Sequence, residues 1–349
     1  MTKFVKGNEA VVIGALYAGG DVYFGYPITP ASEIAHAAAA WFPALGRDFL
    51  QAECETASIN MLYGAASAGR LAITATSGPG MSLMQEGLSY MAAAGIPGVV
   101  VNIQRAGPGL GNVYPEQADY NQAVKGGGHG SYHALVLAPA SVQEMCDFTL
   151  RAFQLAFQYR TPAIVLSDAV QGQMTEPLCL PAAELPPPAG VEAWAVQGTS
   201  ATRGNLHTSI FLDVGVLEQI NIDLQQKYAA LQAEARAECY RTDDAEIVFL
   251  AYGTSSRIAR TAVDQLRASG IRAGLFRPQT LFPFPRAELC QLADRKLIVV
   301  EMSCGQFRDD VIFQFAAGCG KAPDVRLVNR MGGVVLPLEQ VLQEARKLA

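Results

Sequence analysis

The strongest constraint on the fold is a regular alternation of short apolar runs and longer alanine-rich segments in the first half of the chain. Six runs have strand length and are largely apolar: 22–25, 48–51, 71–76, 98–104, 134–138 and 163–167. Nearly continuous apolar runs are typical of strands buried on both faces of a sheet. The intervening segments have helix length, and Thr29-Pro30 indicates a helix start with Thr29 as N-cap. Repeated βα units predict a parallel sheet covered by helices on both faces.

A polar, proline-rich stretch separates this region from a second series of βα units. Residues 181–205 contain Leu185-Pro-Pro-Pro188 and have the composition of a linker, and 217–240 has the pattern of an amphipathic helix. Four more strand candidates follow, at 247–252, 271–276, 296–301 and 325–328. We therefore predict an α/β protein with a first domain at 1–180, a linker with a helix at 181–243, and a smaller, separate α/β domain at 244–349.

Charge, hydropathy and cysteine spacing argue against several classes of function. The net charge of −6 without a Lys/Arg run argues against a nucleic-acid binder. No apolar run approaches the ~18 residues of a membrane span. The closest two of the seven cysteines, Cys290 and Cys304, are 14 residues apart, so local spacing builds neither an iron–sulfur nor a zinc site. Unclustered cysteines fit reduced thiols, and we expect a soluble, cytoplasmic protein without a membrane partner.

Polar residues follow the first four strands, at the edge of the sheet where open α/β sheets bind ligands. They are Thr29 in the run Gly25-Tyr-Pro-Ile-Thr-Pro30, Glu53 and Glu55 after the second strand, and Arg105 after the fourth. Ordinary structural roles remain open for each of them. The acids would be favoured at a helix N-terminus by its dipole, and Arg105 would serve as a surface cation.

Two familiar kinds of site are poorly supported. Gly107, Gly109 and Gly111 mimic a dinucleotide-binding fingerprint, but Pro108 and the run Asn112-Val-Tyr-Pro115 prevent a helix from starting there. A Ser/His/Asp hydrolase site is also disfavoured, because the chain has no GxSxG elbow and only four histidines.

Several long motifs carry a resemblance that runs over nearly the whole chain. They include Tyr23-Phe-Gly-Tyr-Pro-Ile-Thr-Pro30, Gly107-Pro-Gly-Leu-Gly-Asn112, Gln117-Ala-Asp-Tyr120, Lys125-Gly-Gly-Gly-His-Gly130 and Arg277-Pro-Gln-Thr-Leu-Phe-Pro-Phe284. With these motifs the chain resembles the alpha subunit of thiamine-diphosphate-dependent 2-oxoacid:ferredoxin oxidoreductases, and most of all their 2-oxoisovalerate (3-methyl-2-oxobutanoate) branch. Thr76-Ser-Gly-Pro-Gly80 departs from that branch and is similar to the 2-oxoglutarate branch.

The resemblance implies a pyrimidine-type thiamine-diphosphate domain followed by a transketolase C-terminal-like domain. It implies coenzyme A-dependent oxidative decarboxylation of a 2-oxoacid to an acyl-CoA and CO2, with ferredoxin as electron acceptor. The family's Gly-Asp-Gly run for Mg²⁺ and diphosphate is absent here, as are its cluster cysteines. The Mg²⁺–diphosphate site and the [4Fe–4S] clusters are therefore expected in partners: a beta subunit, gamma-like and ferredoxin-like subunits, and an external ferredoxin.

The resemblance also assigns roles to individual residues. Glu55, nine residues before Gly64, matches the glutamate that hydrogen-bonds the aminopyrimidine of the cofactor, whereas Glu53 does not. Thr29 and Arg105 match the residues that contact the substrate. Tyr26 and Pro27 of the same motif are implied as cofactor contacts.

Three alternatives stay open from the sequence. The first is 2-oxoglutarate or pyruvate as substrate, the second a non-catalytic scaffold subunit, and the third a decarboxylase or transketolase relative. A 2-oxoglutarate site needs a second cation, for which Lys125 and His129 are candidates, although an ordinary flexible loop also explains them. A branched-chain substrate needs an apolar pocket, for which the candidate walls are Tyr26, Tyr114 and Tyr120.

Overall fold

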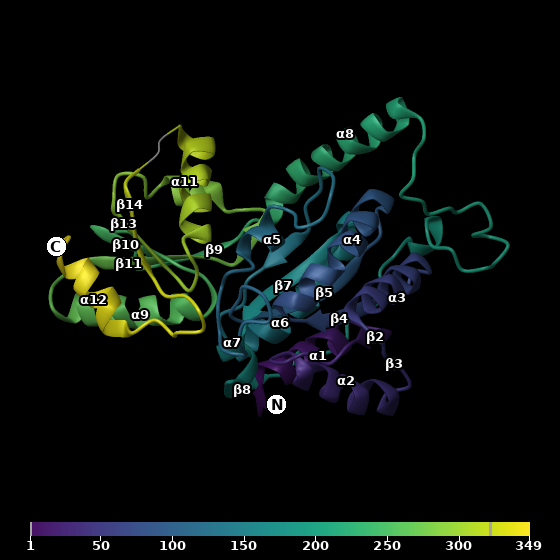
Figure 1. The fold of residues 1–349 in the computed structure, drawn as a ribbon, viewed down its shortest axis with the longest axis horizontal. Helices are drawn as coiled ribbons and strands as arrows, with labels where there is room; N and C mark the ends of the chain where they lie inside the picture. Colours follow the sequence, from purple (N-terminus) through teal and green to yellow (C-terminus); the bar gives the residue numbers. More distant parts are fainter. Residues whose placement is uncertain (1, 321–322) are drawn as a thin grey trace.

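The computed structural model describes residues 2–320 and 323–349 and contains two main sheets, each with helices on both faces (Figure 1). The larger sheet has seven strands in the order β12-β6-β7-β5-β4-β2-β3. Six of them are parallel and confirm the six predicted runs: β2 (Val22–Gly25), β3 (Asp48–Gln51), β4 (Ala72–Thr76), β5 (Gly98–Gln104), β6 (Leu135–Leu137) and β7 (Pro162–Asp168).

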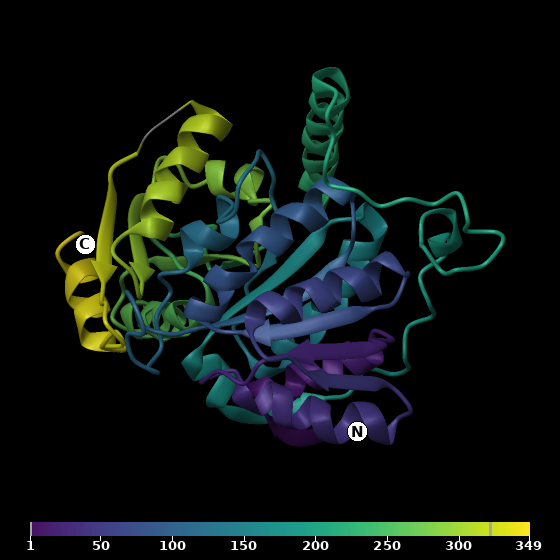
Figure 2. The ribbon, with the colours of Figure 1, turned by 45° about the vertical axis from the view of Figure 1, so that its right-hand side comes forward.

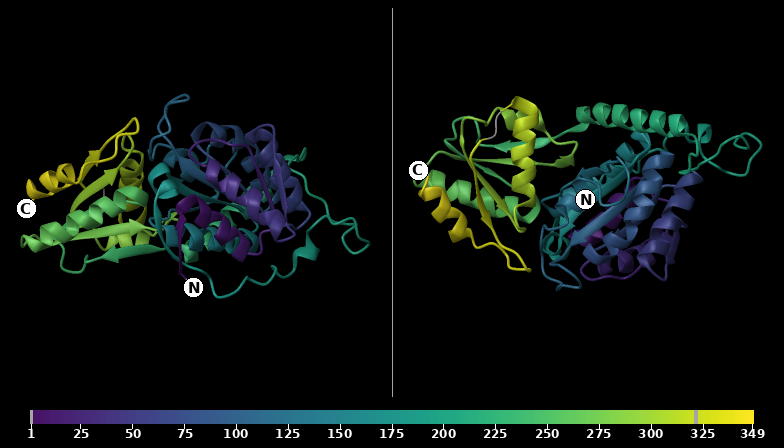
Figure 3. Two further views of the ribbon diagram at one scale, coloured as in Figure 1. Left: turned by 90° about the horizontal axis from the view of Figure 1, so that it is seen from below. Right: turned by 45° about the horizontal axis from the view of Figure 1, so that its top comes forward.

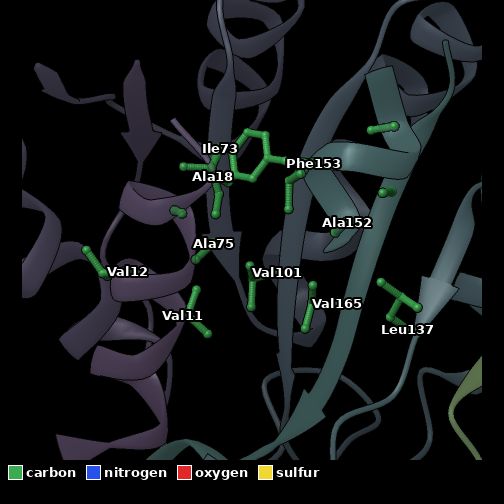
Figure 4. Packing of buried hydrophobic residues seen from close by; sticks show 14 of the residues in the cluster. Val11, Val12, Ala18, Ile73, Ala75, Val101, Leu137, Ala152, Phe153 and Val165 are labelled. Carbon is green, nitrogen blue, oxygen red and sulfur yellow. The ribbon is translucent and has the colours of Figure 1, made fainter. Parts of the chain in front are cut away.

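Two layers of helices cover this sheet (Figure 2). One layer consists of α1 (Gly7–Tyr17), α2 (Ser32–Ala44) and α6 (Val142–Tyr159), and the other of α3 (Glu55–Ser67), α4 (Gly78–Ala94) and the short α5 (Tyr120–Val124). In Figure 4, Val11 of α1 and Phe153 of α6 pack on Val101 and other buried side chains of the sheet. None of the described helices is both long and apolar enough to cross a membrane.

The start of α2 differs from the sequence prediction. The helix begins at Ser32 with Ala31 as its N-cap, so the prediction that Thr29 caps it is wrong. Thr29 instead lies in an exposed loop with a cis peptide bond to Pro30. The carbonyl of Pro30 accepts a hydrogen bond from Nδ2 of the buried Asn8 at 2.8 Å, which holds this loop on α1.

The chain between the two main sheets also differs from its prediction. After α7 (Ala169–Gln173), β8 (Thr175–Cys179) pairs with β1 (Thr2–Lys6) in a small antiparallel sheet. The predicted helix over 217–240 is shorter, because α8 spans Val214–Leu231 and residues 237–240 form β9 (Ala237–Tyr240). Antiparallel pairing with β11 draws this segment into the second sheet. Figure 3 shows α8 beside the first region and the long connection that precedes it.

The second sheet has five strands in the order β14-β13-β10-β11-β9. Its parallel strands confirm the four predicted runs: β10 (Ile247–Leu250), β11 (Ala273–Pro278), β13 (Lys296–Glu301) and β14 (Val325–Asn329). Helices α9 (Gly253–Ala268) and α12 (Leu338–Arg346) pack on one face, and α10 (Arg286–Cys290) and α11 (Gln306–Cys319) pack on the other.

The two sheets are not independent. One hydrophobic cluster contains Met84 of α4 together with Phe276 of β11 and Phe307 of α11, so it spans both regions. In addition, β12 (Thr280–Phe282) leaves the second region and pairs antiparallel with β6 of the larger sheet. The division into two domains stays a prediction, although the segment that follows β11 supplies an edge strand to the larger sheet.

A buried arginine fastens the two regions at this junction. The Nη1 and Nη2 atoms of Arg277 donate to the two carboxylate oxygens of Glu144 on α6, at 2.8 and 2.7 Å, and its Nε donates to Glu238 of β9 at 2.7 Å. The Arg277 side chain is only 7% exposed. Removing one member of a buried ion pair is costly because the remaining charge keeps its desolvation penalty.

We expect Arg277→Met to lower the free energy of unfolding by about 3 kcal/mol, because both carboxylates lose their guanidinium. The control is Arg272→Met, since Arg272 pairs with Glu246 on the surface and both side chains are more than half exposed. Surface pairs contribute little, so this variant should unfold like the parent. Urea denaturation of the purified proteins measures the difference, and equal stability of the two variants would contradict the role given to Arg277.

Candidate active site

The polar residues predicted to gather at one edge of the sheet do so. Strands β3, β2, β4 and β5 are successive neighbours and all parallel, so their carboxyl ends face the same side. The loops that follow them carry Thr29, Glu55 and Arg105. Loop residues beyond the carboxyl ends of parallel strands are the usual ligand-binding groups of such sheets.

Glu55 is the first residue of α3 and is 4% exposed, whereas Glu53 in the preceding loop is exposed. No hydrogen bond or ion pair joins the Glu55 carboxyl to another residue within 2–320 or 323–349. A buried carboxyl without a partner is unusual, because buried polar groups are nearly always hydrogen-bonded. Glu55 is therefore the most conspicuous functional candidate at this edge.

The first turn of α4 lies against the Glu55 carboxyl. A Cβ atom placed on Gly80 would lie 2.3 Å from Oε1 of Glu55 and 2.2 Å from Oγ1 of Thr76, so a larger residue there would force these side chains to shift. The first turn of a helix presents unpaired N–H groups and the positive end of the dipole, which favour a negative charge. The Thr76-Ser-Gly-Pro-Gly80 motif therefore shapes the space in which the carboxyl lies.

Arg105 connects two of the loops at this edge. Its Nη1 donates to the carbonyl of Thr29 at 2.8 Å, and its Nη2 donates to the carbonyl of Leu110 at 3.1 Å. Its Nε is buried and has no partner among the described residues. Arginine has five N–H donors, so the guanidinium retains capacity for an anion after both loops are held.

The exposed side of the site is formed by the Tyr-Pro-Ile-Thr-Pro loop. Thr29, Tyr26 and Pro27 are all exposed, and Tyr26 is 39% exposed. The carbonyl of Thr29 is held by Arg105, while its hydroxyl makes no hydrogen bond within the described chain. The structure thus brings Thr29 and Arg105 into direct contact and leaves the Thr29 hydroxyl available.

Asp119 is a second carboxylate beside α4 that the sequence did not single out. Its Oδ2 accepts a hydrogen bond from Nδ2 of Asn102 at 2.9 Å, and its N–H donates to Oε1 of Gln104 at 3.1 Å. Its oxygens lie 3.6 and 3.8 Å from where a Cβ of Gly78 would be. Burial raises the pKa of Asp119, and the hydrogen bond from Asn102 opposes the shift. Glu55 and Asp119 therefore flank the same helical turn.

The residues proposed for a second cation lie elsewhere. Lys125 forms an ion pair with Asp310, whose side chain is fully buried, so Lys125 has a structural partner. The carbonyl of His129 accepts a hydrogen bond from Ser89 in the middle of α4. Ser89 is 11 residues after Gly78, or about 16 Å along the helix axis. The loop that carries Lys125 and His129 therefore lies beside the later turns of α4, away from Glu55.

Tyr120 is not available as a pocket wall. Its ring is fully buried, and its hydroxyl donates to Asp310 at 2.6 Å. Desolvation and the nearby Asp310 raise the pKa of Tyr120 well above its usual value, so the hydroxyl stays protonated. Of the three tyrosines considered, Tyr26 and Tyr114 are exposed near this edge, and the suggestion for Tyr120 is wrong.

Two family models match the chain. Residues 13–242 match the model described as pyruvate flavodoxin/ferredoxin oxidoreductase, thiamine diphosphate-binding. Residues 245–341 match the pyruvate:ferredoxin oxidoreductase core domain II. Together they cover almost the whole chain, and they meet between residues 242 and 245.

Individual proteins are similar over the same length. The ketoisovalerate oxidoreductase subunit VorB of Methanothermobacter marburgensis is 58% identical, and the match covers 100% of this chain and 98% of that protein. The 2-oxoglutarate synthase subunit KorA of Archaeoglobus fulgidus is 38% identical, with 96% of each chain covered. The solved 2-oxoglutarate:ferredoxin oxidoreductase from Magnetococcus marinus, with 2-oxoglutarate, coenzyme A and succinyl-CoA bound, superposes with a TM-score of 0.87 at 26% identity. The match covers 99% of this chain and 65% of that one.

The contact between Gly80 and Glu55 is tested by a matched pair of substitutions. Gly80→Ala should destabilise the protein by about 1–3 kcal/mol, because the new methyl group overlaps Glu55 and Thr76. Gly64→Ala should stabilise it by about 0.5–1 kcal/mol, since Gly64 lies within α3 with nothing within 4 Å of its Cβ position. Thermal or urea unfolding separates the two, and a stabilised Gly80→Ala variant would contradict the close approach of the carboxyl to this turn.

Proposed function

Because the chain belongs to the pyruvate flavodoxin/ferredoxin oxidoreductase family, we propose that it acts as the alpha subunit of a 2-oxoacid:ferredoxin oxidoreductase. The reaction is the coenzyme A-dependent oxidative decarboxylation of a 2-oxoacid to an acyl-CoA and CO2, with ferredoxin as electron acceptor. The family matches and the structural similarity confirm the resemblance and the α/β fold class inferred from the sequence. The chain contributes one half of the active site.

The buried Glu55 carboxyl is the observation that carries this proposal. Its lack of a protein partner and its position against Gly80 fit a group that brings a ring nitrogen to the carboxyl, as the aminopyrimidine of thiamine diphosphate does. When bound, thiamine diphosphate supplies the nucleophilic carbon and accepts the electrons released by decarboxylation. Glu55 would hold the pyrimidine and the proton shared with it, and Tyr26 and Pro27 would line the same space.

Arg105 and Thr29 are proposed to hold the substrate. A guanidinium binds a carboxylate through two parallel hydrogen bonds, and Nη1 and Nη2 of Arg105 each keep one N–H beyond the one given to a loop carbonyl. The Thr29 hydroxyl lies on the loop that Arg105 already holds, so the two groups are positioned together. Their joint role is to orient the 2-oxoacid, which lowers the entropic part of the barrier.

The other half of the site must come from a partner. The chain has no Gly-Asp-Gly run, so we propose that a beta subunit supplies the Mg²⁺–diphosphate site and that partner subunits carry the [4Fe–4S] clusters. Gamma-like and ferredoxin-like subunits and an external ferredoxin complete the proposed assembly, in the cytoplasm. Exposed apolar side chains next to Arg105 support docking at this edge, with Leu110 80% and Tyr114 63% exposed.

We favour 2-oxoisovalerate as the substrate. The identity to the ketoisovalerate oxidoreductase subunit is 58%, against 38% to the 2-oxoglutarate synthase subunit. The geometry points the same way, because Lys125 is paired with Asp310 and His129 lies far along α4. Neither of the candidate cations for a second carboxylate is at the site.

We also propose the division of the chain into domains at 1–180, 181–243 and 244–349. Two strands pair across these boundaries, because β9 pairs with β11 and β12 pairs with β6.

The role of Glu55 predicts a large effect from a nearly isosteric change. Glu55→Gln in the complete complex should lower turnover by at least about 100-fold, because an amide cannot exchange a proton with the cofactor. Glu53→Gln is the matched control and should retain activity, since Glu53 is exposed two residues earlier. Steady-state assays compare them. An intact Glu55→Gln complex within a few-fold of the parent rate would remove Glu55 from the mechanism, and loss of the complex itself would favour a scaffold role.

Arg105→Lys should raise the Michaelis constant for the 2-oxoacid about tenfold or more. Lysine keeps the charge, but it loses the planar fork and cannot hold both loop carbonyls. Arg203→Lys in the exposed part of the linker is the control and should leave the constant unchanged. An unchanged constant for the Arg105 variant would mean that the substrate carboxylate binds elsewhere.

The proposed reaction is tested by coenzyme A-dependent viologen reduction with the complete complex. Offered separately, 2-oxoisovalerate should be preferred over 2-oxoglutarate, pyruvate and an aryl 2-oxoacid. A preference for 2-oxoglutarate would keep the mechanism and overturn the substrate. No reduction with any acid, from a complex shown to contain thiamine diphosphate and its clusters, would overturn the proposed activity. Product formation independent of coenzyme A would indicate a decarboxylase or transketolase relative.

A further inference from the structure

The loop that follows Arg105 is a closed unit. The N–H of Ala106 donates to the carbonyl of Tyr114 at 2.9 Å, and the N–H of Asn112 donates to the carbonyl of Ala106 at 3.0 Å. Gly111 has φ +54°, and a Cβ there would lie 1.8 Å from the Ala106 carbonyl oxygen. Since Arg105 itself donates to Leu110 near the tip, the position of this loop and the position of the guanidinium are linked.

Glu116 joins this closed loop to the second region of the protein. Its side chain is 3% exposed; Oε2 accepts from the N–H of Gly107 at 2.9 Å, and Oε1 accepts from the N–H of Gly332 at 2.7 Å. Gly107 is two residues after Arg105, and Gly332 lies in the loop that follows β14. One carboxylate therefore bridges two loops that are more than 200 residues apart in the sequence.

Direct contacts between the two loops reinforce this bridge. Nδ2 of Asn112 donates to the carbonyl of Gly332 at 3.1 Å. Gly333 has φ +87°, and a Cβ there would lie 2.7 Å from Cβ of Tyr114, so the two backbones approach as closely as glycine permits. The loop after β14 thus lies directly against the loop that carries Arg105.

Gln117, the residue after Glu116, also connects this loop to the second region, through the residues that follow β13 and β10. The N–H of Gln117 donates to Met302, after β13, at 2.7 Å, and its Nε2 donates to Tyr252, after β10, at 3.0 Å. Its Oε1 accepts from Ser255 Oγ at 2.6 Å. Glu116 and Gln117 together face the carboxyl ends of β10, β13 and β14, so this edge of the second sheet lies next to the candidate active site.

We propose that Glu116 is a positioning residue that ties the Arg105 loop to the loop after β14, so that the second region sets where the substrate-binding guanidinium lies. This inference rests on the proposed role of Arg105. The bridge requires a carboxylate, because two N–H donors bind its two different oxygens. Glutamine has one oxygen, and its NH2 group would face one of these N–H groups as a second donor.

The test uses Glu116→Gln in the complete complex, with Glu218→Gln on the exposed face of α8 as the matched control. Losing one charge-assisted hydrogen bond on the Arg105 loop should raise the Michaelis constant for the 2-oxoacid about tenfold. The Michaelis constant for coenzyme A and kcat should change by less than about twofold. Glu116→Asp, which keeps both oxygens, should recover part of the effect.

A second measurement does not depend on turnover. Amide hydrogen exchange of the substrate-free complex should increase together in segments 106–114 and 330–335 of Glu116→Gln, because the bridge holds both loops. The control should show the parent pattern. If Glu116→Gln is too unstable to purify, Asn112→Ala removes the neighbouring hydrogen bond between the same two loops, to the Gly332 carbonyl, and should give a paired increase as well.

The outcomes separate the bridge from the proposed reaction. Unchanged exchange in both segments, or exchange that rises in one segment only, would overturn the bridge. A fall in kcat or a rise in the coenzyme A constant, with the 2-oxoacid constant unchanged, would overturn the link to Arg105. If the parent complex oxidises no 2-oxoacid, the proposed function fails, and the exchange result still decides whether Glu116 couples the two loops.

Discussion

Parallel pairing of β3, β2, β4 and β5 is the constraint on which the site depends. Parallel strands place all their carboxyl ends at one edge, and each strand must then be followed by a crossover that begins with a loop at that edge. Thr29, Glu55 and Arg105 are in these loops, so one sheet fixes three groups that are distant in the sequence. The second sheet adds to the same edge, since the loops after β10, β13 and β14 contact residues 116 and 117.

The charged groups at this edge of the larger sheet lie around the first turn of α4. This turn is glycine-rich, and Gly80 allows the Glu55 carboxyl to approach the backbone, while the Asp119 carboxyl lies in ordinary contact range of Gly78. The N-terminal end of a helix is where its dipole favours negative charge. Arg105 lies on a neighbouring loop, and its positive charge lowers the pKa of Asp119 against the larger effect of burial. The site therefore combines acids beside a helix N-terminus with the Arg105 guanidinium, which holds the carbonyls of Thr29 and Leu110.

The sequence predicted the strands well because buried parallel strands are continuous apolar runs, and all ten predicted runs are strands. It also predicted that Thr29, Glu55 and Arg105 share an edge, because the carboxyl ends of parallel strands lie at one edge whatever their order. It did not predict β9 or β12, which are short edge strands formed by pairing with distant partners rather than by local pattern. The roles of Asp119 and Glu116 were missed for the same reason. Their contacts, with Asn102, Gly107 and Gly332, depend on tertiary packing that no spacing in the sequence reveals.

The number of hydrogen bonds that each buried acid accepts distinguishes Asp168 and Glu301, which have structural roles, from the functional candidate Glu55. Burial raises the pKa of both Asp168 and Glu301, yet each accepts several hydrogen bonds. Asp168 caps α7 and accepts from Thr254 Oγ1 at 2.8 Å, while Glu301 accepts from two N–H groups at the start of α11, each at 3.1 Å. These two acids have structural roles, because their carboxylate oxygens accept hydrogen bonds from other groups of the protein. Glu55 is also buried, at 4% exposed, but its carboxyl has no such donor in the described chain, so the fold alone does not account for it. A buried carboxyl that receives no donor from the described chain fits the proposed ligand, which would bring one, and the exposed Leu110 and Tyr114 on the Arg105 loop fit the proposed docking of a partner.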